Sequence, residues 1–477
     1  MTPFLKVLSV LAPEFAVRRA AAQHKLRAMM NYDGASLGRR TKGWKVTGSD
    51  ADAAGLGVRG RLRQLSRDMI RNRPYAKRAI DVVVNNVVGK GIVASIEADD
   101  DAVKTNIEAL VLSHVNSKDV DAHGVQNLAG LQRVAASTVF ESGEVLLRRR
   151  KRDINKYDTH LKLPFQVELL EPDFLDESRQ SHGGNEIREG IEYDAWGKIV
   201  AYWLFEHHPG SATRKIKLTS KRVLAADIIH VRRLDRAGQT RGVPWLAPAL
   251  LTMGELSDYQ EAQILKQKIA AMLVAVIESD ASNGQASFEG KDIVGLESLE
   301  PGAVAELRPG QKVSFSTPPT VDGYDQFMRQ GISAIAMAIG ITYESLAGDL
   351  SRVNFASGKM GRMEMDRNVE AWQQLIMIDQ MCVGIEAWVE QGVLLLNRRL
   401  SGRWKMKWTA PRRPLIDANR EVKAILEQIK GGLISRQQAQ RQLGYDPETV
   451  HKERIEDQQK YEAGLPAQNA TKTEANP

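Results

Sequence analysis

The densest group of side chains that could carry chemistry lies in ELLEPDFLDE, residues 168–177. It contains Glu168, Glu171, Asp173, Asp176 and Glu177. Carboxylates this close together could hold Mg²⁺ for phosphodiester cleavage, so one hypothesis is a Mg²⁺-dependent nuclease that uses Glu171, Asp173 and Asp176. We favour the other interpretation, a strand end followed by an Asp/Pro turn, because no lysine or histidine base accompanies the cluster in register.

Other catalytic motifs are absent from the sequence. GKGI at 89–92 and GKMG at 358–361 lack the upstream glycine and the trailing hydroxyl of a phosphate-binding loop, so ATP hydrolysis is not expected. The neighbours His207 and His208 would point to opposite faces of a strand, which argues against a two-histidine metal site. We therefore expect no catalytic residue, no metal and no cofactor.

Two segments could bind nucleic acid. RRRKR, residues 148–152, continues a strand, so alternate cations would face opposite sides; a solvated edge strand protected against mispairing explains the run equally well. LISRQQAQRQLG, residues 433–444, resembles the second half of a helix-turn-helix, and an αα-hairpin in a helical cap is an equal alternative. The helix-turn-helix interpretation would make the chain a DNA-binding protein.

The chain that must position these residues is large and has the composition of an ordinary soluble protein. The chain has 477 residues, 43% of them hydrophobic, and a formal net charge of +7, which permits a polyanionic partner without requiring one. This length predicts two to four structural units. The single cysteine, Cys382, excludes a disulfide framework and fits a reducing compartment. The longest apolar run, at 269–277, is too short to cross a membrane.

Hydrophobic periodicity predicts an α+β fold. Helical spacing covers 61–88, with a break at Pro74, and continues at 101–116 and 126–142. Strands are expected at 143–152, 164–170 and 227–233, and a hairpin at 191–205 that turns at Asp194–Gly197. The N-terminal region, 1–30, reads as an arm with a small amphipathic helix, a signal peptide being the less supported alternative.

Long helices dominate the remainder. Apolar residues along one face predict a helix over 243–279, about 45–50 Å long, with Pro244 and Pro248 in its first turns. Further helices are expected at 324–341 and 359–398, a strand at 402–408 and short helices over 417–464. Between the first two long helices, residues 280–320 form a Gly/Pro-punctuated, acidic, β-like insert.

Several long phrases together resemble the lambda-type family of tailed-phage portal proteins. They are LLEPDFLDE, GIEYDAWGKIVAYWLFEHHPG, IIHVRRLDRAGQTRGVPWLAPAL and GITYESLAGDLSRVNFASGKMG. The resemblance runs from about Tyr32 to Leu465 and departs at DANRE, 417–421, where the family would have Asp-Pro-x-Lys-Glu.

The resemblance implies a non-enzymatic protein that forms a homododecameric ring at one capsid vertex of a virion and is assembled in the host cytoplasm. Double-stranded DNA would pass through the ring during packaging and ejection without sequence-specific contacts. The resemblance implies no membrane partner. The implied protein partners are the large terminase subunit, the major capsid protein or scaffold, and the head–tail adaptor.

It also implies the layout of a portal subunit: an α/β wing, two long stem helices bracketing a small β-containing clip, and a helical crown. In this sequence the parts would be an N-terminal arm 1–30, wing 31–242, first stem helix 243–279, clip 280–321, second stem helix 322–341, tunnel loop 342–358, a long helix returning to the wing 359–411, crown 412–465 and a disordered tail 466–477.

The tunnel loop gives a role to GDLSRVNFASGKMGR, residues 348–362. Such a loop must touch a moving polyanion without holding it. Arg352 and Lys359 could meet phosphates, Ser351, Asn354 and Ser357 offer neutral hydrogen bonds, and Gly348 and Gly358 would act as hinges.

An acidic clip would suit the docking of a basic surface of the large terminase subunit, and it would repel DNA that lies outside the channel. The carboxylates assigned to terminase or adaptor docking are Glu289, Asp292, Glu297, Glu300 and Glu306.

Overall fold

The computed structural model describes residues 14, 17–19, 21–22, 39, 42–43, 47–213, 219–271, 275–279, 311–315, 323–400, 402–413, 417–445 and 447–464. The chain forms two compact units, Met1–Ala54 and Gly55–Pro477. In the first unit, the described residues between 14 and 22 are helical, as expected for the arm. The predicted tail, 466–477, lies outside the described residues. No helix among the described residues is long and apolar enough to span a bilayer.

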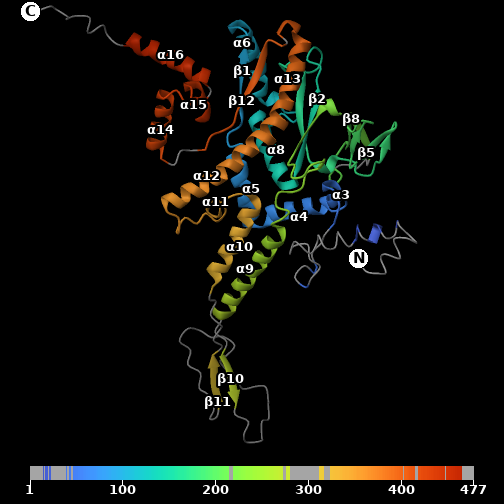
Figure 1. Ribbon diagram of the computed structural model, residues 1–477, viewed down its shortest axis with the longest axis vertical. Helices are drawn as coiled ribbons and strands as arrows, with labels where there is room; N and C mark the ends of the chain where they lie inside the picture. Colours follow the sequence, from blue (N-terminus) through green and yellow to red (C-terminus); the bar gives the residue numbers. More distant parts are fainter. Residues whose placement is uncertain are drawn as a thin grey trace, which may run out of the picture. The chain divides into compact units, whose positions relative to one another are not determined.

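The helices predicted near the start of the second unit are confirmed (Figure 1). They are α4 (Arg59–Asn72), α5 (Pro74–Val87), the helical run α6–η2–α7 (Asp101–Ile107, Glu108–Leu112, Ser113–Val115) and α8 (Leu128–Ser142). Pro74 occupies the first turn of α5, where a missing N–H costs nothing. Asn127 caps the start of α8 and Gly143, with φ of 88°, ends it.

A three-stranded antiparallel sheet lies at the centre of the main hydrophobic core. Its order is β3–β2–β9, with β2 (Glu144–Lys151) between β3 (Phe165–Leu170) and β9 (Ile228–Arg232). All three strands were predicted. β9 pairs only with Glu144–Arg148, so among the described residues the 149–151 end of β2 pairs with β3 alone, as the edge-strand interpretation of 148–152 predicted. β9 comes almost 80 residues after β2, and local periodicity cannot show that two such distant segments pair.

A five-stranded sheet shares a second, smaller core with the three-stranded sheet: Ile191, Tyr202 and Leu204 cluster there with Leu146, Leu170 and Ile228. Its strands, in order, are β4 (Ser181–His182), β5 (Asn185–Arg188), β6 (Ile191–Tyr193), β7 (Ile199–Phe205) and β8 (Ser220–Leu224). The β6–β7 hairpin turns where predicted, and Asp194 Oδ1 accepts hydrogen bonds from two backbone N–H groups of the turn at 2.9 Å. A separate two-stranded sheet pairs β1 (Val93–Ala98) with the predicted strand β12 (Trp404–Thr409).

The first long helix is shorter than predicted at both ends: α9 covers Leu250–Ala271, not 243–279. At its start, Trp245 is buried and donates its indole N–H to the Ile339 carbonyl at 3.1 Å, so tertiary packing holds 245–249 in turns. At its end, Ala275–Ser279 forms β10, which pairs antiparallel with β11 (Gln311–Phe315). An apolar run of this kind fits a helix or a strand, and the available partner decides.

The second long helix, α10 (Tyr324–Ile339), ends at Gly340, close to the prediction. α9 and α10 pack against each other, and both contribute to the main core. A Cβ at Gly331 of α10 would lie 2.6 Å from the Leu256 side chain of α9, so this crossing needs a residue without a side chain.

The third long helix is a continuous run of α12 (Phe355–Trp372), the π-helical segment η6 (Gln373–Cys382) and α13 (Val383–Leu396). It starts at Phe355, four residues before the predicted position. Cys382 is fully buried on it. The C-terminal helices are α14 (Ala418–Lys430), α15 (Arg436–Gln442) and α16 (Pro447–Gly464), in the predicted region (Figure 1).

Candidate functional site

The segment 342–359, singled out by sequence, is a short helix, an exposed turn and the first residues of α12. Helix α11 (Tyr343–Ala347) is capped by Thr342, and Gly348, with φ of 72°, ends it. Tyr343 packs on Arg329 of α10, whose guanidinium lies 5.0 Å from the ring centroid. The turn that follows therefore lies beside α10.

Ser351 and Arg352 lie in this turn, and both are exposed. Asp349 accepts a hydrogen bond from the Ser351 backbone N–H at 2.9 Å, and this contact, with the Ser351 hydroxyl, lowers the pKa of the Asp349 carboxyl. Arg352 Nη2 lies 3.0 Å from Asp325 Oδ2 at the start of α10. The Arg352 side chain is nevertheless 59% exposed, and a surface pair of this kind contributes about 0–1 kcal/mol.

Asn354 and Ser357 have a structural role that the sequence prediction missed. Asn354 Oδ1 accepts from the Ser357 N–H at 2.8 Å and Ser357 Oγ accepts from the Asn354 N–H at 3.2 Å, which is a complete capping box for α12. Lys359 lies in the first turns of α12 and is half-buried. Gly358 is helical, and a Cβ there would lie 2.9 Å from Val353; the prediction that Gly358 is a hinge is wrong.

The predicted docking carboxylates Glu289, Asp292, Glu297, Glu300 and Glu306 lie outside the described residues. The strands β10 and β11 bracket the segment that contains them.

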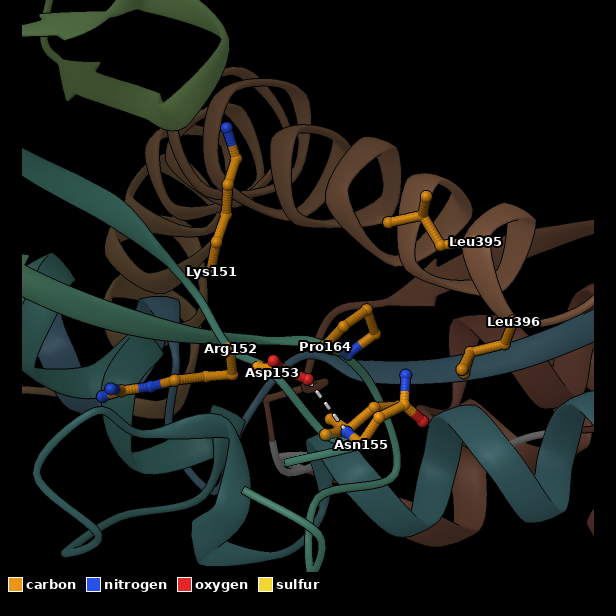
Figure 2. A pocket seen from close by; sticks show the side chains of 8 residues that line it. Lys151, Arg152, Asp153, Asn155, Pro164, Leu395 and Leu396 are labelled. Atoms are coloured by element: carbon orange, nitrogen blue, oxygen red, sulfur yellow. Dashed lines mark hydrogen bonds between the residues drawn. The ribbon is translucent and has the colours of Figure 1, made fainter. Parts of the chain in front are cut away.

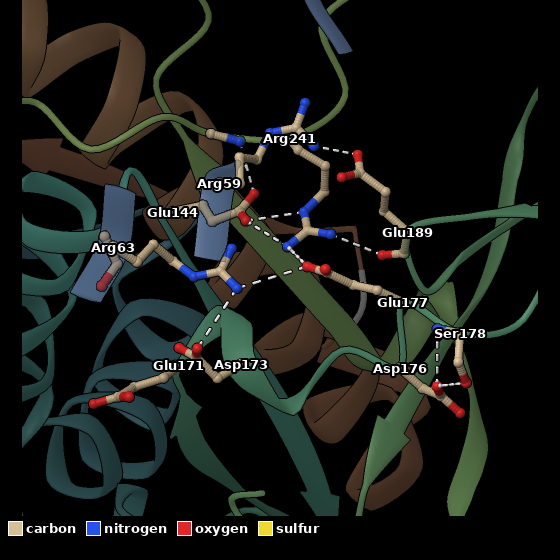
Figure 3. A network of polar contacts seen from close by, with 12 residues as sticks. Arg59, Arg63, Glu144, Glu171, Asp173, Asp176, Glu177, Ser178, Glu189 and Arg241 are labelled. Atoms are coloured by element: carbon tan, nitrogen blue, oxygen red, sulfur yellow. Dashed lines mark hydrogen bonds and ion pairs between the residues drawn. The ribbon is translucent and has the colours of Figure 1, made fainter. Parts of the chain in front are cut away.

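A buried charge network, absent from the sequence predictions, surrounds the 171–177 carboxylates (Figure 3). Pro172–Phe174 is one turn of 3-10 helix at the end of β3, as the turn interpretation predicted. Three arginines at four-residue intervals on α4 face these acids: Arg59 pairs with Glu189, Arg63 with Asp173 and Glu177, and Arg67 with Glu171 and Asp173. The i, i+4 spacing puts the three guanidinium groups on one helix face, a signal visible in the sequence.

Arg241 and Glu144 form the centre of this network, and both side chains are fully buried. Arg241 donates to Glu144 Oε1 at 2.8–2.9 Å, to the Glu189 carbonyl at 2.8 Å and to Glu177 Oε1 at 3.3 Å. Glu144 Oε2 accepts from the Gly242 N–H at 2.7 Å and lies 2.9 Å from His230 Nε2. These contacts tie the start of β2 to the segment that leads into α9.

The electrostatics of the network follow from burial and pairing. Burial acts to raise the pKa of Glu144, but Arg241 and His230 hold it well below its usual range. Burial lowers the pKa of His230 to about 4, despite the contact with Glu144, so this imidazole is neutral at pH 7. Burial also acts to raise the pKa of Asp173, but Arg63 and Arg67 bring it below its usual range.

The carboxylates do not form the nuclease site considered above. Glu171, Asp173 and His208 place ligand atoms within 4.8 Å of one another, which is the spacing of a metal site. However, the Arg67 guanidinium lies 3.0 Å from Glu171 and 2.6 Å from Asp173 and supplies the positive charge there. Asp176 points away and accepts hydrogen bonds from Ser178 and Ser220, so the three predicted metal ligands are not brought together (Figure 3).

The cations at 149–152 have partners within the fold. As predicted, alternate residues face opposite sides: Arg149 and Lys151 pair with Asp227, whereas Arg150 pairs with Glu168. A pocket of about 500 Å³ lies at the end of this strand, lined by Lys151, Arg152, Asp153, Ile154, Asn155, Pro164, Leu395 and Leu396 (Figure 2). Because its two cations already have partners, Asp227 and Gln166, the pocket is a poor anion site.

Residues 433–444 form a turn and the seven-residue helix α15. Ser435 caps this helix by accepting from the Gln438 N–H at 3.0 Å, and Gly444, with φ of 75°, follows its end.

Comparisons with known proteins agree with one another. A family model described as "Phage portal protein, lambda family" matches residues 37–373. The chain is similar to the probable portal protein of Halomonas phage phiHAP-1, with 25% identity over 438 residues that cover 87% of this chain and 83% of that protein. It is also similar to portal protein B of Escherichia phage lambda, with 21% identity over 494 residues and 92% coverage of both chains.

Among solved structures, two neck structures of a gene transfer agent (GTA) particle share the fold. A chain of the neck of the empty GTA particle, computed with C6 symmetry, matches with a TM-score of 0.51 and 13% identity, covering 80% of this chain and 94% of that one. A chain of the neck of the native GTA particle, computed with C12 symmetry, matches with a TM-score of 0.50 and 13% identity, covering 82% and 95%.

Proposed function

This chain belongs to the lambda family of phage portal proteins, and we propose that its exposed turn at 349–353 meets double-stranded DNA in the channel of the ring. Portal proteins of this family are structural components of the virion and form ring-shaped oligomers. Membership in this family therefore takes precedence over the hypotheses of a nuclease and of a helix-turn-helix protein.

The proposed ring has twelve copies, assembled in the host cytoplasm and placed at one capsid vertex. The C12 symmetry used for the native GTA neck supports this number. DNA would move through the ring in packaging and ejection. The large terminase subunit, the head–tail adaptor, and the capsid protein or scaffold are the proposed protein partners, with the 280–321 carboxylates as the docking surface for terminase or adaptor.

We assign the parts of a portal subunit to the observed elements. The sheets and the helices packed on them form the wing, within 31–242 and 359–411. Helices α9 and α10 form the stem, residues 280–321 the clip, α11 and the turn after it the tunnel loop, and α14–α16 the crown. The arrangement of α9 and α10 supports this assignment, because both helices are rooted in the main core and lead to the β10–β11 pair.

The surface pair of Arg352 with Asp325 is the observation that carries the DNA proposal. A weak exposed pair can exchange Asp325 for a passing phosphate at little cost, and twelve copies multiply a small cationic excess. The contact would be with the backbone and independent of sequence. Lys359, half-buried one turn into α12, would add a second cation with restricted reach.

The test is the double variant Arg352→Ala/Lys359→Ala, compared with Arg367→Ala. Arg367 is a matched control because it is an exposed cation of α12 that pairs with Glu364 at 3.3 Å. We expect the wild type, the double variant and the control to form the same rings in electron micrographs. DNA packaging or retention should fall in the double variant and remain normal in the control. Normal filling and retention in the double variant would refute the role of these cations.

A further inference from the structure

The C-terminal helices present an apolar surface that the fold of one subunit leaves open. In α14, Val422, Ile425, Leu426 and Ile429 recur at helical intervals, and Leu433 continues the row beyond its end. We call these five side chains the α14 stripe. None of them is buried: Val422 is 39% exposed, Leu426 51% and Leu433 77%.

Helix α14 needs a partner for this stripe. A helix of thirteen residues is marginally stable in water by itself, and most helices depend on burying an apolar face. Helix α16 is mainly polar and offers two large apolar side chains, Ile455 and Tyr461, on a stretch, 451–461, that is exposed throughout.

Charge indicates what the partner is. Residues 417–445 carry five cations and three carboxylates, whereas residues 447–464 carry three cations and five carboxylates. The ion pairs described for these helices join Arg420 to Asp417, Lys460 to Glu456 and Lys452 to Glu108, and none of these connects α14 or α15 with α16. Within the subunit α15 lies beside α16, but no ion pair described for these helices joins them, so the α14 stripe and the acidic side chains of α16 remain available between subunits.

We infer that the α14 stripe of one subunit packs on α16 of the neighbouring subunit, so that the crown closes as a continuous ring of helices. A closed ring requires two different, complementary patches on every chain, and the basic α14–α15 surface and the acidic α16 surface meet this condition. The inference rests on the ring described above, but it names a contact that the ring alone does not require.

The experiment uses the full-length protein, with Leu426→Lys as the test and Ala424→Lys as the control. Both changes place a lysine, which is a good helix former, at an exposed position of α14. Residue 424, however, lies on the face opposite the stripe. Hydrogen–deuterium exchange of the 418–430 peptide is measured in purified rings, and mass photometry gives the fraction of rings on dilution.

We expect the wild type and Ala424→Lys to show the same protection of 418–430. In Leu426→Lys this peptide should exchange roughly three- to tenfold faster, the factor that corresponds to re-exposing about half of a leucine side chain, since Leu426 is 51% exposed in the subunit. Peptides of β2 and α5 should be unchanged, showing that the body of the variant is folded.

The failures are distinguishable. A wild-type protein that stays monomeric would overturn the ring itself. Wild-type rings with an unprotected 418–430 peptide, or equal exchange in the two variants, would overturn the crown contact and leave the ring intact. Protection that appears only after adding capsid protein or double-stranded DNA would assign the stripe to that partner and also overturn the inference.

Discussion

Replacing Arg241 with methionine should destabilise the second unit strongly. The side chain is fully buried, and its loss leaves Glu144, also fully buried, without its main opposite charge. Removing one partner of a buried ion pair costs about 3–5 kcal/mol. If Gly55–Pro477 unfolds cooperatively, about 2.1 cal/mol/K for each of roughly 420 residues gives about 1 °C per kcal/mol, so Tm should fall by about 3–5 °C.

The assay is differential scanning calorimetry of the full-length protein, with Arg188→Met as the matched control. Arg188 pairs with Glu186 at 2.6 Å, but both side chains are more than half exposed, so its replacement should change stability by less than about 1 kcal/mol. A Tm of Arg241→Met that equals that of Arg188→Met would refute the argument.

The double variant Glu144→Gln/Arg241→Met separates pairing from packing. Neutralising Glu144 removes the uncompensated charge, so the double variant should lose less stability than the sum of the two single changes. Strict additivity would show that the pair contributes through packing alone.

Two further predictions concern pH and helix packing. Burial lowers the pKa of His114 and of His230 to about 4, against 6.5 in the unfolded chain, so the stability that the neutral imidazoles provide is complete above pH 6.5 and is lost as the pH falls towards 4. Tm should therefore fall as the pH is lowered from 6.5 to 4. A Tm that stays constant over this range would contradict the assignment of neutral, buried imidazoles. Gly331→Ala should cost about 1–3 kcal/mol by forcing a Cβ against Leu256, whereas Gly254→Ala, whose Cβ would meet its nearest neighbour at 3.7 Å, should be neutral or stabilising; a thermal melt compares the two, and equal Tm values would contradict the close crossing of α9 and α10.

Local signals in the sequence correctly predicted those ends of helices and strands that neighbouring residues determine. Pro74 separated α4 from α5, and Asp194–Gly197 placed the β6–β7 turn. Each of these depends on a side chain that acts on its own neighbouring backbone, so no knowledge of distant contacts was required.

The same reasoning failed where a distant segment decides the local conformation. The start of α9 is set by Trp245 packing against α10, and its end is set by the pairing of β10 with β11. Asn354 and Ser357 were interpreted as polar groups of a loop, although their three-residue spacing before α12 is also the spacing of a capping box.

The sequence alone determined the family of this protein, because long phrases in a fixed order carry that information whether or not their contacts are known. It also determined most helices and strands, since caps, turns and periodicity act over one or two turns of chain. Only the tertiary structure decided that Arg59, Arg63, Arg67 and Arg241 neutralise the acids at 144 and 171–189. The charges of this network come from segments up to 130 residues apart. Which of them meet depends on how the sheets and helices pack, a property that no local pattern encodes.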